Sequence, residues 1–307
     1  MKIAFLGTPD FAIPSLQLLC DCGHEITVFT QPDKPVGRRA ILTQPPVKEF
    51  AVSHGLQVFQ PRRIRDGEGQ SALVSCAPDL MVTAAFGQIL SAKNLAVPRY
   101  GCMNVHGSLL PAYRGAAPIQ WAIIGGETTT GVTIMMTDVG LDTGDILLKR
   151  EMAIGPDETA GELSERMAQL GADALKETVA ALLGGTLTRI PQDSAAATRC
   201  GMLKKEHGKL NFHESAQMVH NRVRGVNPWP GAYALQDADI VKIWRTKLTG
   251  NPYMGEPGDC IGSGREGLFV VCGDGLLLEI VELQAPGGKR MDAKAYLRGR
   301  PIGGRFL

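Results

Sequence analysis

The sequence predicts an α/β fold with a largely parallel sheet, followed by a smaller domain made mainly of β-strands. Over the first ~185 residues, short apolar runs alternate with helical patterns, as they do in βαβ units. Beyond residue 206 the pattern changes, and short β-rich runs follow one another without alternating helices. The charge balance also changes between these two parts of the chain.

The first part of the chain contains short apolar runs that predict strands. These runs are Lys2–Leu6, His24–Thr30, Asp79–Ala85, Gly101–His106, Val132–Met136 and Asp145–Glu151. Ile13, Leu16 and Leu19 are spaced for one helical face and predict a helix after the first strand. The segment 31–46 is rich in Pro, Gly and Arg, interrupts the pattern and is expected to be irregular.

A long helix is expected to end this first domain. Thr159 and Glu162 have the spacing of a capping box, and an apolar stripe follows them. The stripe consists of Leu163, Met167, Leu170 and Leu175. Gly184 and Gly185 provide a stop signal for the helix.

The second domain is predicted from three β-rich runs with turn signals between them. The runs are Ile240–Trp244, Leu268–Cys272 and Leu276–Leu283, and they favour a small barrel or sandwich. Residues 190–206 show no periodicity and are interpreted as a linker. We therefore expect a first domain over 1–189, a linker over 190–206 and a second domain over 207–307.

Charge separates the two parts more clearly than the total of +1 suggests. Residues 1–198 carry 16 Lys and Arg against 20 Asp and Glu, a net charge of −4. Residues 199–307 carry 16 against 11, a net charge of +5. This asymmetry favours an acidic catalytic body with a basic appendage that faces a polyanion.

Two further patterns limit the class of protein. No stretch approaches the ~20 apolar residues that span a bilayer, and the N-terminus has no signal-peptide pattern, so we expect no membrane partner and a cytoplasmic location. The seven cysteines include no C-x-x-C pair, so we interpret them as reduced thiols and expect no metal site.

The most informative motif is the run from Asn104 to Pro111. Residues two apart on a strand share a face, so the Asn104 amide and the His106 imidazole point the same way. They lie at the carboxyl end of the strand, where open α/β sheets bind their ligands. An amide and an imidazole in that place can stabilise an oxyanion, and the imidazole can exchange protons near neutral pH.

Asp142 is the third candidate catalytic residue. Gly140 and Gly144 bracket it, so it is expected on a tight loop and not inside a helix or strand. A carboxylate near His106 would orient the ring, favour its protonated form and accept a proton from an attacking amine. Taken separately, each of these residues has an ordinary structural interpretation as a turn or strand-end residue.

The combination resembles the signature of enzymes that use 10-formyltetrahydrofolate. Asn104-x-His106 is followed by Ser108-Leu109-Leu110-Pro111, and Asp142 comes 36 residues after His106. Segments along nearly the whole chain resemble the methionyl-tRNA formyltransferases within that superfamily. They are 7–12, 31–33, 115–120, 227–231 and 273–275.

This resemblance implies a nucleotide-binding-like catalytic domain with helices on both faces of its sheet, and a C-terminal barrel related to the OB fold. It implies Asn104, His106 and Asp142 as the catalytic set. It also implies a folate site formed by three loops. Their residues are Ser108, Leu109, Leu110 and Pro111; Phe86, Gly87, Gln88, Ile89 and Leu90; and Val139, Gly140 and Leu141.

The resemblance further implies that the acceptor is initiator methionyl-tRNA. The loop around Arg38 and Arg39 corresponds to the family's loop that enters the acceptor end of the tRNA, although the residues after Arg38 are less basic than usual. Basic residues of the second domain would add contacts to the RNA backbone. They are Lys204, Lys205, Lys209, Arg222 and Arg224.

The implied reaction is attack by the methionine amine on the formyl carbon, with Asn104 and His106 stabilising the oxyanion and Asp142 orienting His106. Dinucleotide, Walker and nucleophile-elbow motifs are absent, so the folate is expected as a co-substrate and not as a bound cofactor. Three alternatives remain: transfer to a nucleotide-linked amino sugar, hydrolysis of the folate, and a tRNA-binding protein without activity. The resemblance suggests a monomer.

Overall fold

A computed structural model describes residues 1–37, 40–236, 239–299 and 304–307. The chain forms two compact units. Unit 1 consists of Met1–Gly115, Thr130–Met152 and Ser164–Arg199, and unit 2 of Ala116–Thr129, Ala153–Leu163 and Cys200–Leu307. Unit 2 thus includes two segments that the sequence-based division places in the first domain, and that division by function stays a prediction.

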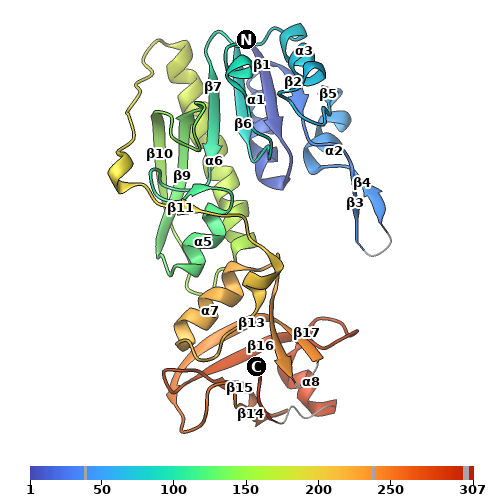
Figure 1. Cartoon of the computed structure of the whole chain (residues 1–307), viewed down its shortest axis with the longest axis vertical. Coiled ribbons are helices and arrows are strands. Elements are labelled where there is room, and N and C mark those ends of the chain that lie inside the picture. Colours follow the sequence, from blue (N-terminus) through green and yellow to red (C-terminus); the bar gives the residue numbers. More distant parts are fainter. Residues whose placement is uncertain (38–39, 237–238, 300–303) are drawn as a thin grey trace. The chain divides into compact units, whose positions relative to one another are not determined.

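Unit 1 is built on a seven-stranded sheet in the order β10-β9-β7-β6-β1-β2-β5 (Figure 1). The strands are β1 Lys2–Gly7, β2 Glu25–Phe29, β5 Gln57–Phe59, β6 Leu80–Ala84, β7 Cys102–His106, β9 Thr129–Met136 and β10 Ile146–Ala153. β5, β2, β1, β6 and β7 pair in parallel, whereas β7 and β9 pair antiparallel. The expected α/β class with a mostly parallel sheet is confirmed.

Helices of unit 1 flank this sheet. They are α1 Ile13–Asp21, α2 Pro46–Ser53, α3 Gly67–Ser75, α4 Ala92–Leu95 and most of α6 Ala160–Leu183, whereas α5 Pro118–Ile124 belongs to unit 2. All five residues of β6 are buried, which explains why this strand is apolar apart from Thr83. On α6, a Cβ at Gly171 would lie 2.7 Å from Val105, so the helix packs closely against β7. The predicted Thr159–Glu162 capping box is present.

The segment expected to be irregular contains a short hairpin. β3 Lys34–Val36 pairs antiparallel with β4 Ile41–Thr43. Among the described residues each strand pairs only with the other, so Pro35 is tolerated at an edge where its missing N–H is not needed. Gly37 adopts a φ of 72°, which suits the start of the turn. Arg38 and Arg39 lie outside the described residues.

Unit 2 contains a six-stranded antiparallel sheet in the order β12-β13-β16-β15-β14, with β17 on β16. The strands are β12 Ala232–Gln236, β13 Asp239–Pro252, β14 Cys260–Ser263, β15 Gly267–Val271, β16 Leu276–Gln284 and β17 Met291–Asp292. The C-terminal residues bridge the two sheet edges, because Leu307 pairs with Leu235 and Phe306 donates to the Gly258 carbonyl. The sheet therefore closes on itself, as the expected barrel requires.

Unit 2 also contains helices that the β-rich texture did not predict. They are α7 Ala216–Gly225 and α8 Ala293–Gly299. Ser215 caps α7, and Val219 and Val223 face the core of unit 2. This capped i, i+4 pattern was a usable signal, but the polar and basic residues between the valines obscured it.

The segment 190–206, expected to be a plain linker, is partly attached to unit 1. The Ile190 backbone pairs with Ile146, and the Thr198 backbone and hydroxyl bond to the loop after Pro111. Within the described part of the chain, no helix is long and apolar enough to cross a membrane.

Candidate functional site

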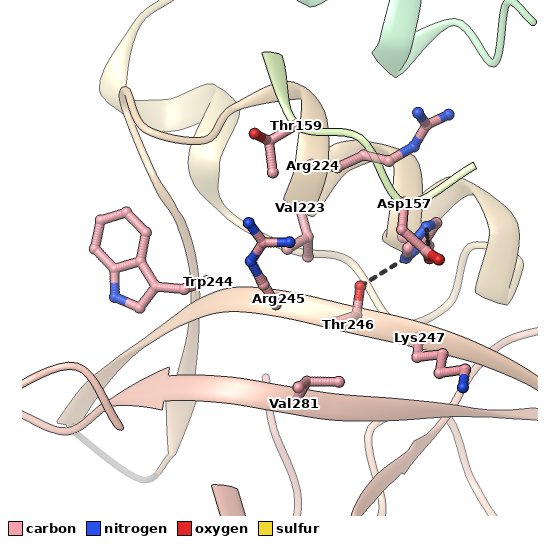
Figure 2. A pocket seen from close by; sticks show the side chains of 10 residues that line it. Asp157, Thr159, Val223, Arg224, Trp244, Arg245, Thr246, Lys247 and Val281 are labelled. Atoms are coloured by element: carbon pink, nitrogen blue, oxygen red, sulfur yellow. Dashed lines mark hydrogen bonds and ion pairs between the residues drawn. The ribbon is translucent and has the colours of Figure 1, made fainter. Parts of the chain in front are cut away.

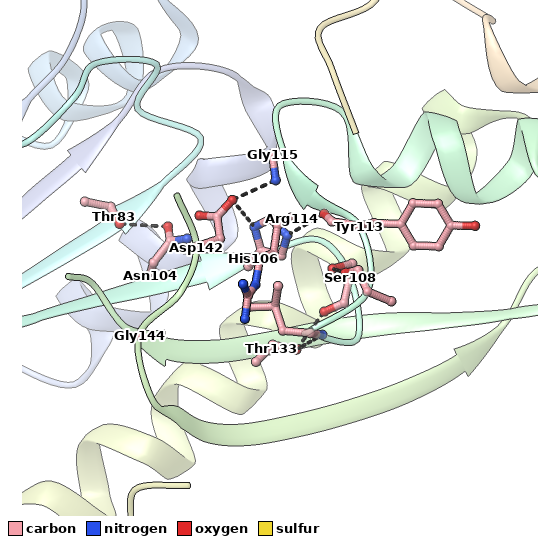
Figure 3. Close-up of polar contacts among 12 residues, drawn as sticks. Thr83, Asn104, His106, Ser108, Tyr113, Arg114, Gly115, Thr133, Asp142 and Gly144 are labelled. Atoms are coloured by element: carbon pink, nitrogen blue, oxygen red, sulfur yellow. Dashed lines mark hydrogen bonds and ion pairs between the residues drawn. The ribbon is translucent and has the colours of Figure 1, made fainter. Parts of the chain in front are cut away.

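Asn104 lies on β7 beside Thr83 of β6, its partner in the parallel register. The Thr83 hydroxyl donates to Asn104 Oδ1 at 2.7 Å (Figure 3). With Oδ1 engaged, the donor end of the carboxamide, Nδ2, points the other way, toward Asp142. The sheet thus orients Asn104 as a hydrogen-bond donor at the carboxyl end of the two strands.

His106 follows two residues later on the same strand and is only 5% exposed. Its Nε2 lies 3.1 Å from the Tyr113 carbonyl oxygen, which can only accept, so Nε2 carries the hydrogen. Its Nδ1 lies 3.8 Å from Asp142 Oδ2. Burial lowers the pKa of His106 below its ordinary value, while Asp142 and the Tyr113 carbonyl raise it. The resting ring is therefore neutral near pH 7, and Nδ1 holds the free lone pair.

Asp142 lies on the loop after β9, and this loop begins beside the N-terminal end of β7. β9 runs antiparallel to β7 and pairs Met136 with Met103, three positions before His106. The loop after β9 must therefore return along the sheet to bring Asp142 to His106. Asp142 has a φ of 52°, and its Oδ2 accepts the Gly115 N–H at 2.8 Å. The predicted Asn, His and Asp set is thus brought together.

Several predicted folate residues have side chains that serve the protein core. Leu110 is buried against Met135 and Ile146, and Phe86 belongs to the core under β6. The Ser108 hydroxyl donates to the Ala112 carbonyl, so it stabilises its own loop. These residues can present backbone groups to a ligand, but their side chains are occupied.

Other predicted folate residues are accessible. Ile89, Val139 and Leu141 are 73%, 78% and 57% exposed, so these large apolar side chains are open to a ligand. The remaining positions are exposed or half-buried; they are Gly87, Gln88, Leu90, Leu109, Pro111 and Gly140. The Gln88 amide is held by the Ile64 N–H and the Pro61 carbonyl. This loop is therefore fixed while Ile89 stays accessible.

The predicted RNA contacts differ among themselves in exposure. Lys204, Lys205 and Lys209 are exposed and Arg222 is half-buried. Arg224 differs from the expected exposed contact, because it is 6% exposed and donates to Asn221 Oδ1 and to two carbonyls of the 155–158 segment. On the buried face of α7, its guanidinium therefore stabilises the 155–158 segment.

Unit 2 has a cavity of about 200 Å³ between α7 and β13 (Figure 2). Trp244, Arg245 and Lys247 line it together with Arg224. Arg245 forms an ion pair with Glu162. The pKa of Glu162 is lowered to about 2, first by the backbone N–H of Thr159 and then by the Thr159 hydroxyl and Arg245. The Arg245 charge is therefore compensated by Glu162, and the residues that line the cavity do not include the Asn, His and Asp set.

Sequence reasoning missed the residues that hold the Asn, His and Asp set in place. Thr83 orients Asn104, and the Thr133 hydroxyl donates to the Ser108 carbonyl and accepts the Leu110 N–H. A threonine inside a buried apolar strand was the available signal for both, since such a hydroxyl needs a partner. Gln192 and Arg114 were missed as well: Gln192 donates to the Asp142 carbonyl, and Arg114 donates to Gln192. In the described ranges, no group of three or more His, Cys, Asp or Glu side chains is arranged to hold a metal ion.

Solved structures with a similar fold include two formyltransferases. The sugar 3N-formyl transferase WlaRD, in the presence of dTDP and 5-N-formyl-THF, has a TM-score of 0.69 at 20% identity, covering 91% of this chain and 96% of that chain. The N-formyltransferase from Helicobacter canadensis, in complex with folinic acid and dTDP-3-aminofucose, has a TM-score of 0.68 at 18% identity, covering 91% and 98%. At these identities the likeness concerns the fold alone.

Sequence comparison is more specific. Methionyl-tRNA formyltransferase of Ruminiclostridium cellulolyticum is 50% identical over 305 residues, which cover 98% of this chain and 97% of that protein. Methionyl-tRNA formyltransferase of Geobacter sulfurreducens is 48% identical over 300 residues, covering 97% and 94%. The formyl transferase family matches residues 1–179, and its C-terminal domain matches residues 202–301. The chain therefore belongs to the formyl transferase family.

Proposed function

We propose that this protein transfers the formyl group of 10-formyltetrahydrofolate to the amino group of methionyl-tRNA, with the initiator tRNA as its substrate. The observation that carries the proposal is the convergence of Asn104, His106 and Asp142 in a chain about half identical to methionyl-tRNA formyltransferases over nearly its full length. Both cytoplasmic location and a monomeric state are part of the proposal, and light scattering tests the latter.

Asn104 stabilises the charge that forms on the formyl oxygen. When the neutral amine attacks the formyl carbon, the electron pair of the C=O double bond moves to oxygen. Asn104 Nδ2 is the donor that the Thr83 hydroxyl directs toward this oxygen, and it is oriented before the reaction starts. Such preorganised donors lower the barrier because they need no reorganisation in the transition state.

His106 Nδ1 is the proton carrier. The neutral ring has its lone pair at Nδ1, so this atom takes the proton that the amine nitrogen loses on bonding to the formyl carbon. The protonated ring then gives that proton to N10 of the folate as the bond between carbon and N10 breaks. The oxyanion collapses to the new amide, leaving formylmethionyl-tRNA and tetrahydrofolate.

Asp142 stabilises the protonated state of His106. Its carboxylate lies 3.8 Å from Nδ1, and its negative charge raises the pKa of a ring that burial would otherwise keep neutral. Before the attack, the same carboxylate passes the ammonium proton on to water, so that the amine is neutral and Asp142 is charged again when His106 takes up its proton. The Gly115 N–H fixes its orientation.

The folate binds beside this set at the carboxyl ends of β6 and β7. Exposed Ile89, Val139 and Leu141 supply apolar contacts to the flat pterin, and the backbone of residues 86–88 supplies hydrogen bonds. The exposed Lys204, Lys205 and Lys209 bind the tRNA backbone, with Arg38 and Arg39 near the acceptor end. Transfer to a sugar nucleotide is the weaker candidate, because the sugar formyltransferases are only about 20% identical.

The proposal is tested with Asn104→Ala. Loss of one oxyanion donor typically lowers kcat about 100- to 1,000-fold. The dissociation constant for methionyl-tRNA, measured by filter binding, should stay within about twofold because Asn104 does not lie on the basic surface. An equal loss of turnover and of tRNA binding would contradict this role.

A further inference from the structure

Gln192 connects the segment after α6 to the loop that carries Asp142. Its Nε2 donates to the Asp142 carbonyl at 2.8 Å and to the Gly144 carbonyl at 2.7 Å. Both N–H groups of one carboxamide are thus used on the backbone of a single loop. The two residues whose carbonyls it binds are the catalytic aspartate and the glycine that ends its turn.

Arg114 determines which end of the Gln192 carboxamide faces the loop. Its Nε and Nη2 donate to Gln192 Oε1 at 3.0 and 2.8 Å. A guanidinium can only donate and a carbonyl can only accept, so only one orientation of the carboxamide satisfies both sides. Arg114 is 4% exposed, which keeps this pairing away from solvent. Figure 3 shows Arg114 beside Asp142 and Gly144 in the same site.

The loop needs an external attachment because of the path it follows. It leaves β9 beside Met103 and must return to His106, and Asp142 adopts a positive φ of 52° that a non-glycine residue rarely adopts. Within the loop, Asp138 accepts from the Gly140 N–H and the Thr143 hydroxyl, which shapes the turn but does not attach it to the sheet. Gly115 holds the carboxylate, and Gln192 holds the backbone.

We propose that Gln192, fixed by Arg114, is a positioning residue that holds the Asp142 loop in its catalytic place against His106. This proposal rests on the proposed role of Asp142. The proposal assigns part of the segment 190–206 to the active site, although the sequence of this segment has no periodicity and predicts a linker. Displacing a reacting group by about 1 Å can cost about 100-fold in rate, so we expect kcat to fall about 10- to 100-fold without Gln192.

Gln192→Glu is the sharpest variant. A carboxylate keeps the shape and still accepts from Arg114, but it has no N–H to donate to the two carbonyls. Its oxygen would face the two carbonyl oxygens and repel them, so the thermal midpoint should fall. Measured well below that midpoint, kcat should fall about 10- to 100-fold while the KM for methionyl-tRNA changes less than twofold. A change that only lowered stability would leave the kcat of the folded enzyme unchanged at that temperature. Ser194→Ala, an exposed neighbour, is the matched control and should behave like the wild type.

A double-mutant cycle tests whether Gln192 acts through Asp142. Gln192→Leu should lower kcat in the wild-type background and change it less than twofold in Asp142→Asn, because the carboxylate to be positioned is gone. An undiminished effect in Asp142→Asn, or wild-type kcat for Gln192→Glu, would overturn the positioning role. If Asp142→Asn itself retains full activity, the failure lies in the proposed catalytic role of Asp142.

Discussion

Thr83→Val tests how much the orientation of the Asn104 side chain contributes to turnover while Asn104 itself is kept. The substitution removes the hydroxyl that donates to Asn104 Oδ1 at 2.7 Å and keeps a side chain of nearly the same shape in a buried position. A neutral hydrogen bond contributes about 0.5–1.5 kcal/mol. Because about 1.36 kcal/mol corresponds to tenfold in rate, kcat should fall about 2- to 13-fold. This is well below the loss of about 100- to 1,000-fold expected for Asn104→Ala.

Single-turnover formyl transfer, with enzyme in excess over methionyl-tRNA, measures the chemical step directly. Thr30→Val is the matched control, because Thr30 is fully buried and its hydroxyl has no hydrogen-bond partner among the described residues. The control should keep the wild-type rate. In an Asn104→Ala background, Thr83→Val should have no further effect. A wild-type rate for Thr83→Val alone would refute the claim that the sheet orients the Asn104 donor.

Three further predictions concern titration, stability and RNA binding. Burial lowers the pKa of His106 more than Asp142 raises it, so the ring should titrate below about 6.5 when followed by NMR. The folded state then binds the proton less readily than the unfolded chain does. The free energy of unfolding should therefore fall as the pH drops below about 6.5. Asp142→Asn should lower that midpoint further, and a wild-type midpoint above 6.5 would contradict the assignment. Glu162→Gln should lower the free energy of unfolding at pH 7, measured with urea, by about 1 kcal/mol, a modest value because the side chain is 44% exposed. The Glu162 contribution should be lost as pH falls from 4.5 toward about 2, and equal acid sensitivity of wild type and variant would show that it is absent. Lys204→Ala combined with Lys205→Ala should raise the KM for methionyl-tRNA and weaken its salt dependence by about two counterions, with kcat unchanged; an unchanged salt slope would exclude these lysines from the RNA contact.

The strands and the core of the site follow from patterns that the sequence carries locally. Parallel strands buried on both faces are nearly continuous apolar runs, and β6 is one apart from Thr83. Asn104 and His106 share a face because they are two residues apart on β7. Asp142 was indicated by its two flanking glycines and by the family resemblance, and it does lie against His106.

The remaining features depend on contacts between distant positions. Gln192 lies 50 positions from Asp142, so nothing in its neighbourhood in the sequence indicates that it holds that loop. The tautomer of His106 depends on the Tyr113 carbonyl in the following loop. Arg224 is a residue type that commonly contacts RNA, but it lies on the buried face of α7. Burial and long-range hydrogen bonds decide these cases, and local patterns do not report them.

The identity of the acceptor is the central claim, and one measurement tests it most directly. Labelled formyl transfer from 10-formyltetrahydrofolate is followed with charged initiator methionyl-tRNA, uncharged tRNA, free methionine and a nucleotide-linked amino sugar in parallel reactions, with release of free formate as a measure of hydrolysis. The account predicts rapid formation of formylmethionyl-tRNA and negligible product in the other reactions. Transfer to the amino sugar, or release of formate without an acceptor, at a rate equal to or above that with methionyl-tRNA would contradict it.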